Sequence, residues 1–331
     1  MKIMVYEARP DERADLEKQA ALHGVELSVT DAVPTLENAS LAAGCIGVSI
    51  LGQGCIDAAL LDAYHALGIR YLSTRTIGYD HIDLDHARSI GLRVCSASYA
   101  PNGVADFTVM MILMCLRHYK QALWRGQVND FSLTGLQGRE MKDLTIGIIG
   151  TGRIGAQVAR NLSGFGCRIL AYDLRRNPAV EPQVTYVDFD TLLAQSDVIT
   201  LHMPLLDSNR HIINRESIAK MRDGVVIVNC SRGELADIEA LIEGIETGKI
   251  GALGMDTVEG DEGIIHADHR VDILPNRNWF YLHQFRNVIM TQHMAFYTDA
   301  AVASMVACGI GGICQMAAGE SCPTELTGPV Q

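Results

Sequence analysis

The stretch from Leu144 to Asp173, LTIGIIGTGRIGAQVARNLSGFGCRILAYD, decides the fold of this chain. It predicts a buried strand, a glycine-rich turn, a helix and a second strand that ends on a carboxylate. Gly150 permits the tight turn, Gly152 lets the backbone approach a pyrophosphate, and Gly155 lets the helix pack closely on the strand. The spacing of these glycines therefore predicts a dinucleotide site.

The end of the second strand indicates which dinucleotide binds. Asp173 lies 18 residues after Gly155, where a carboxylate accepts hydrogen bonds from ribose hydroxyls. Because the same charge repels a 2′-phosphate, the sequence predicts NAD rather than NADP as the cofactor. Arg175 and Arg176 leave the alternative open, since either guanidinium could pair with a phosphate or simply be solvated at the surface.

Composition narrows the class of protein. A chain of 331 residues exceeds what one core normally serves, so two domains are expected. The 39 acidic and 27 basic residues give a net charge of −12, which disfavours nucleic acid and anionic membranes as partners. The apolar run 107–116 is too short to span a bilayer, and residues 1–13 carry no secretory signal.

Cysteine and histidine spacing points to a reducing compartment. The nine cysteines are scattered and form no CxxC pair, which predicts free thiols in a cytoplasmic protein. No metal is predicted, because the histidines show no recognised metal-binding spacing. His266 and His269 form the nearest pair, and we interpret them as surface or inter-segment residues.

Apolar strands alternate with amphipathic helices along most of the chain, which requires parallel sheets with crossover helices. The strands predicted before the glycine turn are 3–7, 26–30, 46–51, 70–74 and 92–96, and those predicted after it are 198–201, 225–229, 251–256 and 288–291. The predicted fold class is α/β, with two doubly wound parallel-sheet domains: a flavodoxin-like substrate domain split in sequence and a Rossmann NAD-binding domain in the middle.

The predicted domains are 1–100 with 299–331 for the substrate and 101–298 for NAD. A final helix, about 300–316, is expected to return to the first domain, which would leave a cleft between the two. A long helix over 104–123, apolar on more than one face, is expected to need a large partner surface. The tail from Gly319 is predicted to be irregular.

Three polar residues follow predicted strands of the nucleotide domain, at the sheet edge where such folds bind ligands. The guanidinium of Arg232 suits a carboxylate and an adjacent carbonyl, although a structural salt bridge is the alternative. His293 could exchange a proton with a substrate hydroxyl or could be an ordinary core histidine. Asp261 could orient that imidazole, in a loop that three other acids crowd: Asp256, Glu259 and Glu262.

Several motifs, in one order along the chain, resemble the D-isomer-specific 2-hydroxyacid dehydrogenase family. They are STRTIGYDHIDLDHARSIGLRV (73–94), YAPNGVADFTVMMILMCLR (99–117), GTGRIG (150–155), LHMPL (201–205), NCSRGELAD (229–237), GALGMDTVEGDEG (251–263) and TQHMAFYT (291–298). The long gap between the acidic loop and His293 is similar to D-lactate and (R)-2-hydroxyisocaproate dehydrogenases. The segments SYAPNGVADFT and HMAFYT especially resemble D-lactate dehydrogenases of the vancomycin-resistance kind.

The resemblance implies roles for the residues at matching positions. Arg232 would bind the substrate carboxylate and keto oxygen, and His293 would act in acid/base catalysis. Asp261, 29 residues after the arginine, would be the acidic partner of His293; the family usually has glutamate there, and Glu259 or Glu262 could take its place. The substrate would also contact the backbone amides of Ile77 and Gly78 and the side chains of Tyr99 and Phe296.

The same resemblance implies the residues that hold NAD, with Asp256 at the nicotinamide carboxamide. They are Gly150, Gly152, Arg153, Ile154, Gly155, Asp173, His202, Pro204, Cys230, Asp256 and Val104. The implied reaction is NADH-dependent reduction of a 2-keto acid, with pyruvate as the first candidate, to the (R)-2-hydroxy acid, D-lactate. The alternatives are a bulkier keto acid (2-ketoisocaproate, phenylpyruvate or 2-ketoglutarate) and a non-catalytic NAD-sensing binding protein. A homodimer through the NAD-binding domain is expected.

Overall fold

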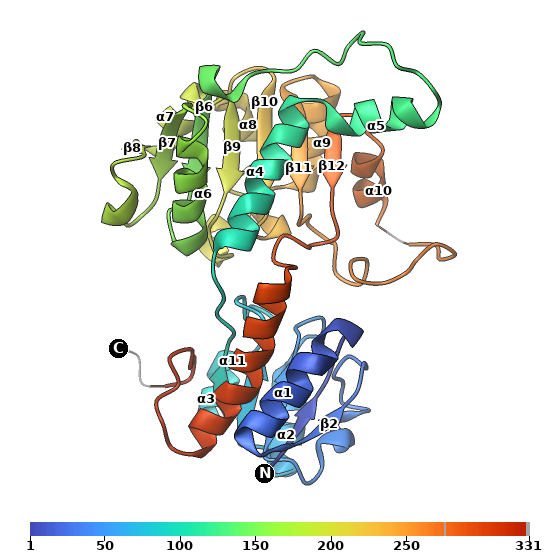
Figure 1. The fold of residues 1–331 in the computed structure, drawn as a ribbon, viewed down its shortest axis with the longest axis vertical. Helices are drawn as coiled ribbons and strands as arrows, with labels where there is room; N and C mark the ends of the chain where they lie inside the picture. The colour runs from blue at the N-terminus through green and yellow to red at the C-terminus, as the bar shows by residue number, and fades with distance from the viewer. Residues whose placement is uncertain (275, 329–331) are drawn as a thin grey trace. The chain divides into compact units, whose positions relative to one another are not determined.

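The computed structural model describes residues 1–274 and 276–328. The chain forms two compact units (Figure 1): Met1–Ala100 with Tyr297–Gln331, and Pro101–Phe296. The return to the first unit falls after Phe296, two residues before the predicted boundary at 298. Residues 329–331 of the predicted first domain lie outside the described residues.

The first unit contains a five-stranded parallel sheet in the order β2-β1-β3-β4-β5. Its strands are β1 (Lys2–Val5), β2 (Glu26–Val29), β3 (Gly47–Ile50), β4 (Tyr71–Thr74) and β5 (Arg93–Cys95). Side chains alternate between the faces, so Ile3 and Val5 pack with α1 (Arg13–His23) and α11 (Asp299–Ala317). Met4 packs on the other face with residues of α2 (Ala58–Ala66) and α3 (Leu84–Ser89). Both faces are therefore buried.

The last helix, α11, is a core helix of the first unit. By length and composition alone it could cross a membrane. Its residues Val306, Ile310 and Ile313 are fully buried, however, and the helix packs against α1 and β4. The tail beyond it returns to β5, where Arg93 and Glu325 form an ion pair of 2.6 Å.

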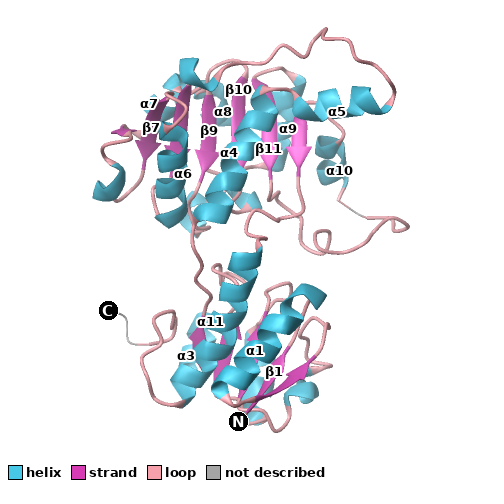
Figure 2. Cartoon of the chain, in the orientation of Figure 1, coloured by secondary structure: helices cyan, strands magenta, loops and turns pink. Residues whose placement is uncertain are grey.

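The second unit contains a seven-stranded parallel sheet (Figure 2) in the order β12-β11-β10-β9-β6-β7-β8. Its strands are β6 (Thr145–Ile149), β7 (Arg168–Tyr172), β8 (Thr185–Tyr186), β9 (Val198–Leu201), β10 (Val225–Asn229), β11 (Ile250–Met255) and β12 (Val288–Met290). Helices α4 (Asn102–Leu116) and α6 (Arg153–Ser163) pack on one face. Helices α7 (Phe189–Gln195), α8 (Arg215–Lys220) and α9 (Ile238–Glu246) pack on the other. The predicted fold class is confirmed.

The predicted long helix over 104–123 is wrong near its carboxyl end. The structure has two helices there, α4 and α5 (Tyr119–Gln127), separated at His118 by a left-handed backbone with a φ of +50°. Lys120, in the first turn of α5, donates to three carbonyl oxygens, of His283, Phe285 and Val288, at 2.8, 2.9 and 2.6 Å. His283 is the last residue of α10 (Arg277–His283), Phe285 follows that helix, and Val288 is the first residue of β12, so contacts distant in sequence hold α5 in its position.

A buried ion pair ties the elements of the first unit together. The side chains of Arg75 and Glu12 are both fully buried, with Nε and Oε1 3.0 Å apart. The guanidinium also donates to the carbonyl oxygens of Tyr6 and Glu7, at 3.0 and 3.2 Å. Because these carbonyls follow β1, and Arg75 follows β4, one cation connects two strand ends with the start of α1.

Replacing Glu12 tests this connection. Glu12→Gln would leave the charge of Arg75 buried without its counterion, which is expected to lower the free energy of unfolding by about 3–5 kcal/mol. Urea unfolding followed by circular dichroism would measure the change. The control is Glu26→Gln, whose pair with Lys2 at 3.0 Å is exposed to solvent and is expected to change the free energy of unfolding far less. Equal losses in both variants would contradict the prediction.

Candidate active site

The glycine turn after β6 has room for a phosphate on one side. Gly150 has a φ of +93°, and a Cβ there would lie 2.5 Å from the carbonyl oxygen of His202. A Cβ on Gly155 would lie 2.0 Å from the carbonyl oxygen of Gly150, whereas one on Gly152 would meet nothing within 4 Å. Gly152 is the N-cap of α6, so the first turn of that helix begins beside open space. This arrangement fits the pyrophosphate of NAD.

Asp173 follows β7 and is joined to the glycine turn. Its Oδ2 accepts from the amide and hydroxyl of Thr151 at 2.6 and 3.0 Å, and its Oδ1 accepts from the amide of Arg175 at 2.9 Å. Each carboxylate oxygen has two lone pairs, so Oδ1 keeps an acceptor site for a ribose hydroxyl. Arg175 and Arg176 are exposed, and the Arg176 guanidinium lies over the ring of Tyr186 at 5.4 Å.

The other residues predicted to contact NAD differ in exposure. Burial lowers the pKa of His202 to about 3, so its imidazole is neutral, and its Nε2 lies 2.9 Å from the hydroxyl of Thr200. Burial raises the pKa of the Cys230 thiol, which keeps it protonated. Val104 is buried in the first turns of α4, Ile154 is half-buried, and Arg153 and Pro204 are exposed.

Arg232 lies in a tight loop after β10 that the sequence did not explain. The buried Asn229 holds this loop, accepting from the amide of Ser231 at 3.0 Å and donating to the carbonyl of Arg232 at 2.7 Å. A Cβ on the next residue, Gly233, would lie 2.2 Å from the backbone of Val258. Only glycine permits this approach, so the arginine loop packs directly on the loop that carries the acids.

Asp256, at the end of β11, holds the loop of His293. Its Oδ1 accepts from the hydroxyl of Thr291 at 2.5 Å and the amide of Met294 at 2.9 Å, and its Oδ2 accepts from the amide of Ala295 at 2.8 Å. His293 lies between these donors with a φ of +52°, a conformation that costs a non-glycine residue roughly 1–2 kcal/mol. The buried carboxylate therefore shapes the backbone that presents the imidazole.

The acids of the loop after β11 have distinct surroundings. Burial raises the pKa of Asp261 to about 6, partly opposed by the hydrogen bond from Val258, and the charges of nearby acids raise it further. Glu259 contacts His211 at 2.6 Å, and Glu262 is exposed. Glu259 is thus engaged elsewhere, and Asp261 stays the predicted partner of His293.

The same loop brings a second imidazole to His293. His266 Nε2 lies 3.2 Å from the carbonyl oxygen of His293, and the two ring centroids are 6.1 Å apart. Phe296 lies edge-on to both rings, at 6.3 Å from His293 and 6.4 Å from His266. His269, three residues later, contacts Asp272 at 2.8 Å instead. Sequence spacing paired His266 with His269 and did not indicate its contact with residue 293.

The substrate residues predicted in the first unit follow its strands. Ile77 and Gly78 lie in the loop after β4, where the hydroxyl of Thr76 donates to the carbonyl of Gly78 at 2.7 Å. Over the residues that the structure describes, the amides of Ile77 and Gly78 donate to no protein acceptor. They are therefore available to an anion. Tyr99 is half-buried in the segment after β5.

The second unit combines a glycine turn that has room for a phosphate with an arginine and a histidine at the same edge of the sheet. This combination is typical of nucleotide-dependent dehydrogenases. The model of the "D-isomer specific 2-hydroxyacid dehydrogenase, NAD binding domain" family matches residues 109–295. The chain belongs to this family. It is an NAD-dependent D-2-hydroxyacid dehydrogenase, whose second unit binds NAD.

Individual relatives agree with this assignment. The chain is 42% identical to an aromatic 2-oxoacid reductase of Clostridium sporogenes over 92% of this chain and 93% of that one. It is 36% identical to the D-lactate dehydrogenase of Escherichia coli, over 98% and 100%. The NAD-complexed structure of a D-isomer specific 2-hydroxyacid dehydrogenase from Lactobacillus delbrueckii matches with a TM-score of 0.85 and 30% identity, over 98% and 100%.

Asp261→Asn tests the acidic partner. Removing a carboxylate that stabilises the protonated imidazole is expected to move the high-pH limb of kcat/KM for keto-acid reduction to lower pH. Because the pKa of Asp261 is about 6, the carboxyl is neutral below that pH, so the variant should differ from the wild type mainly above it. Initial rates of NADH oxidation across pH measure the limb. Glu262→Gln, the exposed neighbour, is the control, and an unchanged limb in Asp261→Asn would assign the role to another group.

Proposed function

We propose that this enzyme reduces pyruvate to (R)-lactate with NADH. The observation that carries the proposal is that Arg232 and His293 follow β10 and β12, the two strands that flank β11, at the carboxyl edge of the sheet. The glycine turn follows β6 of the same parallel sheet and therefore lies at the same edge. This position supports our assignment of Arg232 as the cation for a carboxylate and of His293 as a proton donor.

In the proposed reaction, the Arg232 guanidinium binds the substrate carboxylate and polarises the keto oxygen. In the first unit, we propose the amides of Ile77 and Gly78 and the side chain of Tyr99 as substrate-binding groups; in the second unit, we propose Phe296 beside the substrate side chain. Bound NADH supplies a hydride to the keto carbon. His293 donates a proton to the keto oxygen, and Asp261 stabilises its protonated form. One keto acid, one NADH and one proton give one hydroxy acid and NAD.

A second candidate substrate is an aromatic 2-oxo acid. The identity to the aromatic 2-oxoacid reductase, 42%, exceeds the 36% to the Escherichia coli D-lactate dehydrogenase. Phe296 would offer such a substrate an aromatic ring beside His293. Both candidates share the chemistry at the keto group and differ only in the side chain that the pocket accepts.

We place the enzyme in the cytoplasm, because its nine cysteines are all free thiols. The relatives reported above are named for enzymes, which favours catalysis over the NAD-sensing alternative.

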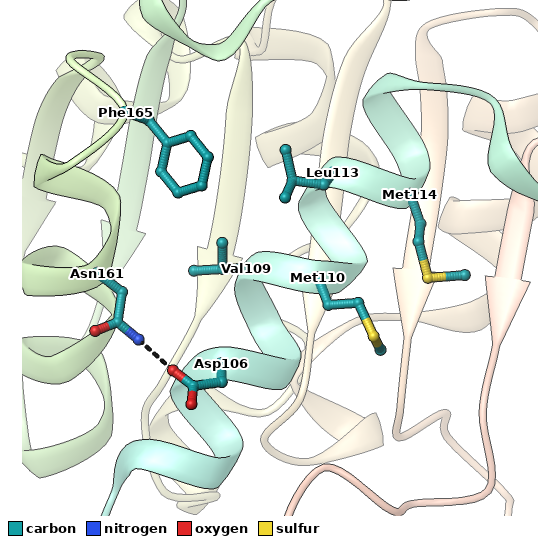
Figure 3. A pocket seen from close by; sticks show the side chains of 7 residues that line it. All are labelled: Asp106, Val109, Met110, Leu113, Met114, Asn161 and Phe165. Atoms are coloured by element: carbon teal, nitrogen blue, oxygen red, sulfur yellow. Dashed lines mark hydrogen bonds between the residues drawn. The ribbon is translucent and has the colours of Figure 1, made fainter.

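We also propose a homodimer through the second unit. A groove of about 580 Å³ lies between α4 and α6 (Figure 3), with apolar walls from Met110, Leu113 and Phe165. At its end Asp106 accepts a hydrogen bond of 2.7 Å from Asn161. Past α4, further large apolar residues are exposed: Leu123, Trp124, Val128, Phe131 and Leu133. Apolar surface of this extent on neighbouring segments is typical of an interface, and a second copy of the chain is the occupant we propose.

A panel of keto acids tests the substrate. Steady-state rates are measured with pyruvate, 2-ketoisocaproate, phenylpyruvate and 2-ketoglutarate, and the highest kcat/KM is expected for pyruvate. Rates with NADPH are expected to be lower than those with NADH, because Asp173 repels the 2′-phosphate of NADPH. A higher kcat/KM for phenylpyruvate would establish the second candidate instead. Tight binding of NADH without reduction of any keto acid in the panel would favour the alternative, a non-catalytic NAD-sensing binding protein.

The same assays test the two central residues. His293→Asn is expected to lower kcat by about 10²- to 10⁴-fold, because it removes the proton donor, while NADH affinity is retained. Arg232→Met is expected to lower kcat and also to raise KM for the keto acid, because the substrate carboxylate loses the guanidinium that binds it. Activity close to that of the wild type in either variant would contradict the mechanism.

Light scattering after gel filtration tests the dimer. The wild type is expected to elute at twice the 36.0 kDa of one chain. Met110→Lys, which places a charge in the groove, should shift the protein towards the monomer. Leu22→Lys, at an exposed apolar residue of α1, is the matched control and should stay dimeric. A monomeric wild type would refute the proposal.

A further inference from the structure

The peptide group between His293 and Met294 is held at both of its ends. Its N–H donates to Asp256 Oδ1 at 2.9 Å, and its carbonyl oxygen lies 3.2 Å from His266 Nε2. The two partners lie ten residues apart, because Asp256 directly follows β11 and His266 lies further along the loop after that strand. The plane of this one peptide is therefore set from two directions.

The plane of that peptide controls where the imidazole of His293 points. His293 has a φ of +52°, which few non-glycine residues adopt without support. Fixing the following peptide plane fixes ψ of His293 and thereby the direction of its Cα–Cβ bond. Asp256 holds the amide, and without a donor at the carbonyl the peptide could tilt about that single attachment. His266 supplies this donor.

The chemistry of the contact determines the state of His266. A carbonyl oxygen only accepts, so Nε2 of His266 must carry the hydrogen. The loop that presents His266 is itself anchored, since the side chain of Asn276 donates to the carbonyl of Gly260 at 2.7 Å and the amide of Ile264 donates to the carbonyl of Asp261 at 3.0 Å. The ring of Phe296 lies edge-on to that of His266, with the centroids 6.4 Å apart.

We propose that His266 is a positioning residue for catalysis: its Nε2–H holds the carbonyl of His293 and so aims the imidazole that donates the proton. The inference rests on the proposed function, because it requires His293 to be the proton donor. His266 itself touches neither the reacting atoms nor the nucleotide in this role. Its loss should therefore reduce kcat and leave NADH binding intact.

Three substitutions separate the hydrogen bond from the ring. His266→Ala removes both, His266→Phe keeps a ring without a donor, and His266→Gln keeps an N–H donor at the position of Nε2. With the fastest keto acid of the panel, Ala and Phe are expected to lower kcat by about tenfold, with KM for NADH within about twofold of the wild type. Gln is expected to recover most of the loss. His269→Ala, in the same loop but bonded to Asp272, is the matched control and should retain wild-type kcat.

Thermal unfolding and NADH fluorescence titration of each variant would show that the fold and the nucleotide site are intact. Wild-type kcat in His266→Ala, or equal losses in His266→Ala and His266→Gln, would overturn the inference while the wild-type activity still supports the proposed function. A wild type that reduces no member of the panel would overturn the proposed function and the inference with it.

Discussion

The site of this dehydrogenase depends on the buried carboxylate of Asp256. A carboxylate that is only 1% exposed must be satisfied by hydrogen bonds, and here the donors are Thr291, Met294 and Ala295. To bring these donors to one side chain, the backbone after β12 turns sharply, and this turn puts His293 into its left-handed conformation. The hydrogen bonds that stabilise the buried carboxylate of Asp256 therefore also place the imidazole of His293.

Parallel pairing then gathers the remaining groups. All strands of the second unit run the same way, so the segments after β6, β7, β10, β11 and β12 meet at one edge of the sheet. Glycines let these segments approach: Gly155 packs on the carbonyl of Gly150, and Gly233 packs on the backbone of Val258. Each glycine lacks a side chain that would prevent this approach, Gly155 at the predicted nucleotide-binding turn and Gly233 next to Arg232.

Burial also sets the charges at this edge. His202 and Cys230, whose side chains are partly buried, stay uncharged at neutral pH, because desolvation disfavours their ionised forms. Burial also raises the pKa of Asp261, to about 6, which lets this carboxyl ionise in the neutral range. A chain with a net charge of −12 thus carries both a guanidinium, that of Arg232, and a partly buried acid, Asp261, at this edge.

The sequence alone determined the strands 198–201 and 225–229, the glycine turn and the sheet edge of Arg232, Asp261 and His293, because a continuous apolar run, which marks a strand buried on both faces, and glycine conformation are local properties. Only the tertiary structure decided the helix break at His118, the engagement of Glu259 by His211 and the contact of His266 with residue 293. Each of these depends on partners far apart in the chain, Lys120 and Val288 among them, and local periodicity carries no record of such contacts.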